Sequence, residues 1–244
     1  MKKYSKREIL DKCNEYINLH GQPLKNGALF YKESFVNYKG EVRASKEAED
    51  REFYTEIVAE FLLTNPDVLD AIEQIDRSKY KIDGHDGKYD PKSNRVEEKL
   101  AMDMFNYCKS SPNHMYEGFG RIIDYQIPLK KSNNDEGVGK IDLLSKNDDT
   151  LFILELKIPD SKETMLRCAL ECYTYWKMAN HSNLIRSYEF DDVKYVKAAP
   201  LVYYGGIQWQ EMQENRVNLE LLMKKLGIAG PFYYEMNSIF SIRE

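Results

Sequence analysis

Three charged residues interrupt two apolar segments of the chain that have the composition of β-strands. Asp142 lies near the start of the first segment, and Glu155 and Lys157 lie at the end of the second. Because side chains alternate between the two faces of a strand, Glu155 and Lys157 point to the same face. Burial of such charges is unfavourable unless they pair or bind a metal ion. The chemistry that suits this set best is metal-assisted cleavage of a phosphodiester bond.

A polar turn at 146–150 joins the two segments, so an antiparallel pair would set Asp142 opposite or diagonal to Glu155. Converging carboxylates favour a hard cation such as Mg²⁺ (or Mn²⁺), which keeps several waters and also binds substrate phosphate. The ion would polarise the phosphoryl oxygen and lower the pKa of a bound water. Lys157 would orient that water or stabilise the developing negative charge. A base role for Lys157 would require a lowered pKa.

The whole chain has the composition of an ordinary globular protein, with 244 residues, 42% hydrophobic and 31% charged. Its net charge of −5 does not exclude nucleic-acid binding, because phosphate contacts depend on local cationic surface. No apolar run approaches the roughly 18 residues of a membrane span, and we expect no signal peptide and a cytoplasmic location. Without C-x-x-C spacing, the cysteines are expected to be reduced core thiols. They are Cys13, Cys108, Cys168 and Cys172.

The predicted elements divide the chain near residue 90 into a mainly helical part, 1–90, and an α/β part, 91–244. In the first part, Ser5 and Glu8 have the spacing of a capping box at the start of a helix. Asn65-Pro66 is typical of a helix start, with proline in the first turn. The predicted elements are a helix from Ser5 to about Gly21, a hairpin or irregular strand over 28–36, a helix over 46–63 and a short helix after Pro66.

The second part predicts a mixed sheet with helices packed on it. Pro159 ends the third strand, and Asp160 with Glu163 has capping-box spacing for the next helix. Gly137-Val138-Gly139 is expected to turn the backbone tightly before the second strand. The predicted elements are a helix over 95–109, strands over 121–129, 140–145 and 151–157, a helix over 160–180, a strand over 200–204, a helix over 211–226 that ends at Gly227, and a short strand near Phe232.

Asp142, followed by Glu155-Leu156-Lys157 at the end of the next strand, resembles the motif of the PD-(D/E)XK nuclease superfamily. That superfamily includes restriction endonucleases, Holliday-junction resolvases and RecB-type exonucleases. The resemblance covers about residues 94–204 and implies a restriction-endonuclease-like α-β-β-β-α-β core. It also implies metal-dependent hydrolysis of DNA, with a role in defence or repair by analogy. Ile141 stands where many members have proline, and many other members also lack that proline.

The resemblance implies a further metal-site glutamate on the helix before the first strand. Glu97 and Glu98 are adjacent candidates there. Glu97 lies near the centre of the apolar stripe of this helix, and Glu98 projects about 100° away from it. We therefore favour Glu97, with Glu98 as the alternative. Asn94 and Glu97 could instead form a capping box.

RecB-like nucleases carry Gln-x-x-x-Tyr on the helix after the third strand, and Glu171-x-x-x-Tyr175 takes that place here. The alternative is an ordinary i,i+4 ion pair of Arg167 with Glu171. We expect Glu171, Arg167, Tyr175 and Lys140 to contact the substrate or support the site. Several cationic residues could follow a phosphate backbone, although a solvated surface explains each one singly. They are Lys130, Lys131, Lys140, Lys162, Arg167 and Lys177.

Two alternatives to the enzyme stay open. The same fold could serve as an inactive DNA-binding or assembly module, or an unrelated α/β protein could hold Asp142, Glu155 and Lys157 as a structural ion-pair cluster. The presence of all three residues favours the enzyme. The sequence does not determine whether the protein forms a homodimer, which DNA sequence it would cleave, or whether it would act as an endonuclease or an exonuclease. The histidines lack metal-ligand spacing; they are His20, His85, His114 and His181.

Overall fold

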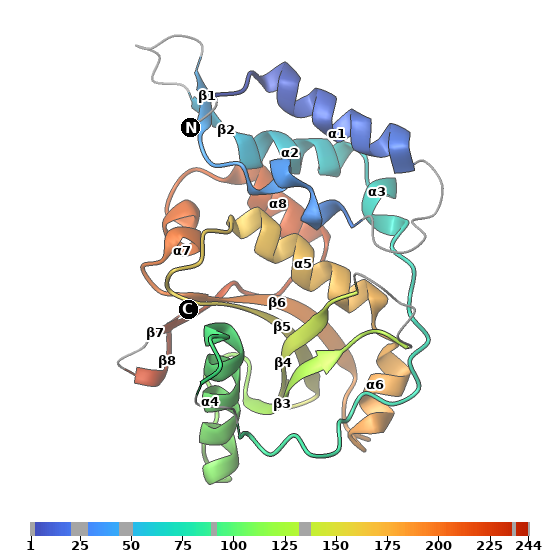
Figure 1. Ribbon diagram of the computed structural model, residues 1–244, viewed down its shortest axis with the longest axis vertical. Helices are drawn as coiled ribbons and strands as arrows, with labels where there is room; N and C mark the ends of the chain where they lie inside the picture. The colour runs from blue at the N-terminus through green and yellow to red at the C-terminus, as the bar shows by residue number, and fades with distance from the viewer. Residues whose placement is uncertain are drawn as a thin grey trace.

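The computed structural model describes residues 3–20, 29–43, 51–88, 92–131, 138–235 and 238–243. Among these residues, six strands form a mixed sheet in the order β3-β4-β5-β6-β7-β8. Helix α5 covers one face of this sheet and α4 lies against the other (Figure 1). The strands are β3 (Arg121–Pro128), β4 (Lys140–Asn147), β5 (Thr150–Lys157), β6 (Tyr195–Tyr203), β7 (Phe232–Glu235) and β8 (Ser238–Arg243).

Helices surround the sheet, and two short strands pair with each other outside it. The helices are α1 (Lys6–His20), α2 (Tyr54–Thr64), α3 (Asp67–Asp70), α4 (Val96–Ser110), α5 (Met165–Met178), α6 (His181–Ser187), α7 (Ile207–Met212) and α8 (Val217–Lys225). The 3₁₀ turns are η1 (Phe30–Lys32) and η2 (Ser34–Asn37), and the separate strands are β1 (Glu41–Arg43) and β2 (Arg51–Phe53).

The prediction of a mixed α/β fold is confirmed. β3, β4 and β5 pair antiparallel, β5 and β6 pair parallel, and β6 and β7 also pair parallel. β3 lies at an edge of the sheet, which is where a strand tolerates Pro128, a residue that cannot donate a ladder hydrogen bond. The Ser5–Glu8 capping box forms at the start of α1, with the Ser5 N–H donating to Glu8 Oε2 at 2.7 Å.

Two predictions in the N-terminal part are wrong. The described part of 28–36 forms the turns η1 and η2 instead of a strand. Neighbouring side chains, Phe30 with Tyr31 and Phe35 with Val36, are all buried, and a strand would turn one of each pair outward. The helix expected over 46–63 begins only at Tyr54, because the preceding residues pair with β1 as strand β2. Residues 46–50 lie outside the described residues.

Two predictions in the second part also need correction. The helix expected from Asp160 begins at Met165, where the Thr164 hydroxyl accepts the N–H of Arg167 at 3.2 Å. Glu163 therefore does not cap it. The helix expected over 211–226 is two helices, α7 and α8, which are separated at the buried Arg216. Gly227, with φ +68°, follows the end of α8 as predicted.

Side chains on the two faces of the sheet belong to two cores. The core beside α4 is formed largely by α4, β3 and the inward residues of β5. The core beneath α5 also includes α1, η1, η2 and α2, so the parts 1–90 and 91–244 pack together. Glu56 of α2 joins them further, because its carboxylate accepts the N–H groups of Asn218 and Leu219 at the start of α8. The boundary near residue 90 thus marks a change in element type rather than a gap in packing.

The loop before α4 is tied to the sheet edge. His85 Nδ1 lies 2.7 Å from Asp124 Oδ1, and the Tyr188 hydroxyl donates to the other oxygen of Asp124 at 2.5 Å. The Asn106 side chain on α4 donates to the Gly87 carbonyl at 2.8 Å. These contacts hold His85 and Gly87 against β3 and α4.

The four cysteines are free and buried, as predicted. In the described part of the chain, no helix combines the length and apolar character needed to cross a membrane. Gly139 does not have the left-handed φ of a tight glycine turn. A glycine is required there by close packing, because a Cβ would lie 2.1 Å from the Tyr175 hydroxyl oxygen. Gly137 lies outside the described residues.

Candidate active site

Asp142 and Glu155 meet where the pairing of β4 with β5 ends. The last paired residues are Leu143 and Leu154, and one more step along this register sets Asp142 opposite Glu155. Beyond this point Asp142 Oδ2 accepts the backbone N–H of Leu156 at 3.0 Å. Asp142 is 8% exposed and Glu155 is 3% exposed. The structure therefore brings these two sequence-predicted carboxylates together at a buried strand end.

Gln126 of β3 flanks Asp142 on the other side, between the pairs Tyr125–Leu143 and Ile127–Ile141. Its backbone has φ +47°, a region that few residues other than glycine adopt. Its Nε2 donates to Asp142 Oδ1 at 2.9 Å. The sequence carried no signal for this residue, because its role depends on a neighbouring strand.

At this position the side chains of the β3–β4 pair also change from one face of the sheet to the other. Tyr125 and Leu143 pack in the core beside α4, whereas Ile127 and Ile141 pack in the core beneath α5. Residues two apart on a regular strand share one face, so the change of core shows a local twist between them. The twist brings Asp142 to a hollow that also borders α4.

Lys157 is surrounded by three carboxylates. Its Nζ lies 2.5 Å from Glu155 Oε1, 2.9 Å from Glu163 Oε2 and 3.4 Å from Glu171 Oε2. Burial lowers the pKa of the Lys157 amine, but the nearby negative charges, Glu155 foremost, raise it well above its ordinary value. Lys157 is therefore an ammonium here, and the lowered pKa that a base role requires is not found.

Helix α5 and the residue before its cap, Glu163, supply the outer members of this cluster. Arg167 Nε lies 2.8 Å from Glu163 Oε1, so the ion pair of Arg167 with Glu171 considered above does not form. Glu171 instead uses Oε2 toward Lys157, while its Oε1 accepts the Tyr175 hydroxyl at 2.8 Å. Glu163 is a member that the sequence analysis missed, since its spacing from Asp160 indicated a helix cap.

The site holds more negative than positive charge, and the pKa values of three of its carboxyl groups, Asp142, Glu97 and Glu155, are raised. Burial is the main cause for each of them. It raises the pKa of Asp142 to about 6, and the Lys157 ammonium opposes the shift. Burial followed by the Asp142 charge raises the pKa of Glu97 to about 7 and that of Glu155 well above its ordinary value.

A hollow of about 380 Å³ lies between the start of α4 and the strand ends. Glu98 Oε1 pairs there with the exposed cations Arg95 at 2.8 Å and Lys140 at 3.9 Å. Glu97 carries no such pair, and α4 has no side-chain cap, so the alternative capping box of Asn94 with Glu97 does not form. The lining residues are Asn94, Arg95, Val96, Glu97, Glu98, Gln126, Asp142 and Ile158.

The donor chemistry of the site fits a hard divalent cation. Glu155 Oε2 is buried and has no hydrogen-bond partner, so it is an oxygen with a free lone pair beside Asp142. Across the described ranges, no three acidic, His or Cys side chains are grouped closely enough to hold an ion by themselves. Mg²⁺ needs no such cage, because it commonly binds one or two carboxylates and completes its shell with water and phosphate.

The other predicted cations are not all at the site. Lys140 has a side chain that is 47% exposed and lies 3.9 Å from Glu98, a residue that lines the hollow. Lys177 pairs with Asp70 of α3 at 3.7 Å and belongs to a different surface. Lys162 is exposed on the segment before α5. A cationic track along the whole set is therefore not formed. The cations near the hollow are Lys140 and Arg95, which share the carboxylate of Glu98.

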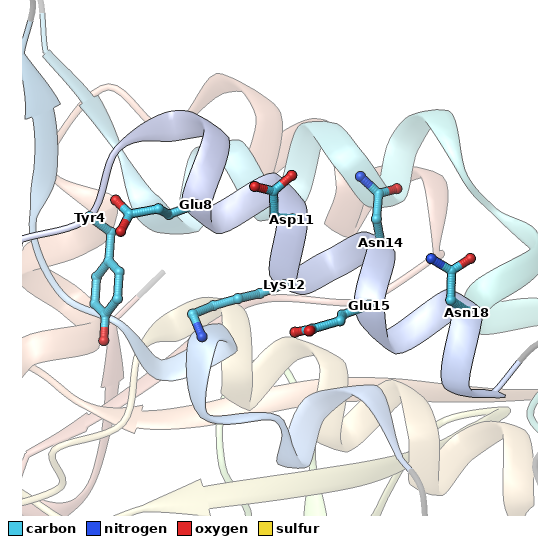
Figure 2. Close-up of a pocket in the computed structure, with 7 residues that line it drawn as sticks. All are labelled: Tyr4, Glu8, Asp11, Lys12, Asn14, Glu15 and Asn18. Atoms are coloured by element: carbon cyan, nitrogen blue, oxygen red, sulfur yellow. The ribbon is translucent and has the colours of Figure 1, made fainter.

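A second hollow, of about 440 Å³, lies along α1 (Figure 2). Except for Tyr4, which precedes α1, the side chains that border it are aligned along this one helix, and none of them is buried. It has no charged group at a strand end, so we do not regard it as the reaction site. Its lining residues are Tyr4, Glu8, Asp11, Lys12, Asn14, Glu15 and Asn18.

Comparisons with known proteins identify no relative. No protein-family model, no curated protein and no solved structure matches the chain. A function must therefore be argued from the site and from the short motif that it contains.

Proposed function

We propose that this protein is a metal-dependent nuclease of the PD-(D/E)XK type that hydrolyses phosphodiester bonds in DNA. The observation that carries the proposal is the meeting of Asp142, Glu155 and Lys157 at one end of a buried strand pair. The order α4-β3-β4-β5-α5, followed by α6 and β6, supports it, because it contains the order that the resemblance implies. A role in defence or repair follows only from the analogy with the family.

Asp142 and Glu155 would hold the Mg²⁺ or Mn²⁺ ion, with Glu97 as a further oxygen donor from α4. When bound, the ion supplies Lewis-acid polarisation of the phosphoryl oxygen and lowers the pKa of water. Gln126 and the Leu156 N–H orient the two oxygens of Asp142. Pre-oriented groups need little reorganisation when charge develops in the transition state.

Lys157 would act as a fixed ammonium. Its charge is maintained by the surrounding carboxylates, so it can donate to a phosphate oxygen or to the attacking water but cannot remove a proton. Three carboxylates hold the amine in place. This arrangement supports stabilisation of negative charge on the reacting phosphate rather than base catalysis.

Two cations would guide the substrate. Arg95 lines the same hollow as Asp142, Lys140 pairs with Glu98 of that hollow, and both cations are partly exposed. Contacts from such side chains to phosphates fix the position of a nucleic acid without reading its sequence. A phosphate held by Arg95 lies in the same hollow as the metal-site carboxylate.

The experiment is cleavage of supercoiled plasmid and single-stranded DNA with Mg²⁺ or Mn²⁺. Asp142→Asn, Glu155→Gln and Lys157→Met preserve side-chain size, and each is expected to reduce the rate by about 100-fold or more. Lys177→Met is the matched control, because it removes a paired lysine outside the site, one that lies on α5 and pairs with Asp70. Equal rates in the control and in the three site variants would contradict the proposal.

The ion pairs of Lys157 favour one alternative, a structural ion-pair cluster without catalysis. The same assay separates the alternatives. Retarded migration of DNA without cleavage would identify a binding module, and neither retardation nor cleavage would identify a structural cluster. In the last case, joint replacement of the charged groups by apolar residues is expected to be neutral or stabilising.

A further inference from the structure

We propose that Tyr31, in the N-terminal part of the chain, is a positioning residue of the candidate site that acts on Lys157 through Tyr175 and Glu171. This inference rests on the proposed function and extends it to a residue outside the α/β part. It assigns the N-terminal part a direct place in the site. Nothing in the motif Asp142, Glu155 and Lys157 points to Tyr31.

A continuous series of contacts leads from Tyr31 to Lys157. The hydroxyl oxygens of Tyr31 and Tyr175 are 3.3 Å apart, and their rings meet edge to face with centroids 6.0 Å apart. The Tyr175 hydroxyl lies 2.8 Å from Glu171 Oε1, and Glu171 Oε2 lies 3.4 Å from Lys157 Nζ. Glu171 thus uses one oxygen toward each neighbour.

The direction of these hydrogen bonds follows from the number of protons. A carboxylate only accepts, so Tyr175 must donate its one hydroxyl proton to Glu171. Its oxygen can then only accept from Tyr31, which makes Tyr31 the donor. The chain therefore runs from Tyr31 to Tyr175 to Glu171, and removal of the Tyr31 hydroxyl leaves the Tyr175 oxygen without a donor.

The surroundings prevent water from replacing Tyr31. Tyr31 is 2% exposed and Tyr175 is 5% exposed. The backbone at Gly139 approaches the Tyr175 hydroxyl so closely that no Cβ fits between them. A buried hydroxyl that loses its partner here cannot recover it from solvent, and such a loss is unfavourable.

The segment that carries Tyr31 is fastened to Thr164, the N-cap residue of α5. The Thr164 N–H donates to Asn37 Oδ1 at 2.7 Å, and the Thr164 hydroxyl donates to the Val36 carbonyl at 3.0 Å. η1 and η2 both lie against α5 (Figure 1). The position of Tyr31 relative to Glu171 is therefore set by α5 itself, the helix that carries Glu171.

The consequence lies in the placement of the Lys157 amine. Glu171 is one of three carboxylates that hold it, and the bond from Tyr175 keeps Glu171 Oε2 directed toward Nζ. Without the Tyr31 hydroxyl, Tyr175 keeps its bond to Glu171 but loses the donor that fixes the position of its own hydroxyl, so Glu171 is held less firmly and the amine can shift toward Glu155 and Glu163. Because Tyr31 does not touch the substrate, the loss should reduce kcat and leave KM unchanged.

The decisive variant is Tyr31→Phe, which keeps the ring and removes only the hydroxyl. In DNA cleavage we expect kcat to fall about 5- to 30-fold, with KM within twofold of the wild type. Tyr175→Phe should have a similar effect, and the double variant should lose little more. Tyr80→Phe is the matched control, because it removes another buried hydroxyl, one bonded to the Asn180 N–H at 2.8 Å.

A second measurement does not depend on nuclease activity. In metal-free protein with ¹³C-labelled tyrosine and lysine side chains, Tyr31→Phe should shift the ¹³Cζ signal of Tyr175 and the ¹³Cε signal of Lys157. Tyr80→Phe should shift neither. The signals are identified by their disappearance in Tyr175→Phe and Lys157→Met.

The outcomes separate the two proposals. Unchanged Tyr175 and Lys157 signals in Tyr31→Phe overturn the positioning role, whether or not DNA is cleaved. Wild-type cleavage with an unchanged kcat in Tyr31→Phe overturns it as well. Shifted signals in a wild-type protein that cleaves no DNA support the positioning of Lys157 by Tyr31 and reject the nuclease proposal.

Discussion

Glu155 and Lys157 form an ion pair of 2.5 Å at the end of β5, and both side chains are nearly removed from solvent. The pair uses only one oxygen of Glu155, since Oε2 has no hydrogen-bond partner. Lys157 also serves two carboxylates of the α5 region. The site is thus short of positive charge, and its carboxyl groups outnumber the one ammonium that they share.

Replacement of Lys157 by methionine should destabilise the protein strongly. The variant leaves Glu155, Glu163 and Glu171 grouped without their shared cation, and removal of one partner from a buried ion pair costs about 3–5 kcal/mol. Urea unfolding without metal measures this loss. Lys177→Met breaks a more exposed pair at 3.7 Å and should change the free energy of unfolding by less than about 1 kcal/mol. Similar losses in the two variants would show that Lys157 is not held as described.

Binding of Mg²⁺ should stabilise the wild-type protein. An ion that binds only the folded state adds about 2.7 kcal/mol when its concentration is 100 times its Kd. Asp142→Asn and Glu155→Gln remove proposed metal oxygens, so Mg²⁺ should raise Tm in the wild type and in neither variant. Calorimetry with and without Mg²⁺ tests this expectation, and an equal rise in all three proteins would place the ion elsewhere.

Glu97 should make the metal-free protein less stable as pH rises. Its pKa is about 7 in the folded protein and about 4.5 in the unfolded chain, so the folded state binds more protons between these values. Its contribution to the free energy of unfolding is therefore greatest below about pH 4.5 and falls as pH increases to about 7 and above. Asp142, with a pKa raised to about 6, acts in the same direction.

The variant Glu97→Gln removes the contribution of Glu97 to the pH dependence of the free energy of unfolding. Relative to the wild type, this variant should gain about 1–3 kcal/mol in the free energy of unfolding between pH 4.5 and pH 7.5. Urea unfolding of both proteins at several pH values gives the difference. Glu98→Gln serves as the control, because Glu98 lies at the rim and pairs with Arg95. Parallel pH profiles for the wild type and Glu97→Gln would contradict a buried carboxyl at this position.

In a strand, replacement by alanine usually leaves a protein more stable than replacement by glycine, and we expect the reverse at Gln126. Either replacement removes the hydrogen bond to Asp142, a loss of about 1.5–3 kcal/mol for a charged acceptor. Glycine also relieves the backbone strain at φ +47°, so Gln126→Gly should be at least as stable as Gln126→Ala. At Lys146, in the regular part of β4, glycine should be the less stable of the two by about 0.5–1 kcal/mol. The midpoints of urea unfolding are measured for alanine and glycine variants at both positions. If glycine is the less stable replacement at Gln126 as well, the left-handed conformation of Gln126 is contradicted.

Gly139→Ala should introduce a steric clash with Tyr175. Its Cβ would lie 2.1 Å from the hydroxyl oxygen and 2.5 Å from the ring carbon that bears it, and such overpacking costs about 1–3 kcal/mol. The cost should shrink when Tyr175 is replaced by leucine, which removes the ring. A thermodynamic cycle over the two sites measures the coupling. A cost that is the same in both backgrounds would mean that the two groups do not meet.

The sequence alone determined the features that depend on neighbours along the chain. Alternation along β5 put Glu155 and Lys157 on one face, and the short connection between β4 and β5 limited their register enough to bring Asp142 near. The capping box at Ser5 formed because its two partners are three residues apart. Local spacing settles such features before any long-range contact is made.

Only the tertiary structure decided the features that depend on distant partners. The break between α7 and α8 occurs where Arg216 is buried and its guanidinium binds the Thr55 hydroxyl, a contact with a different helix. Gln126 and Tyr31 reach the site from elements whose sequence gave no sign of it. Their roles arise from strand twist and from helix packing, which bring together groups far apart in the chain, and no periodicity along the sequence records such distances.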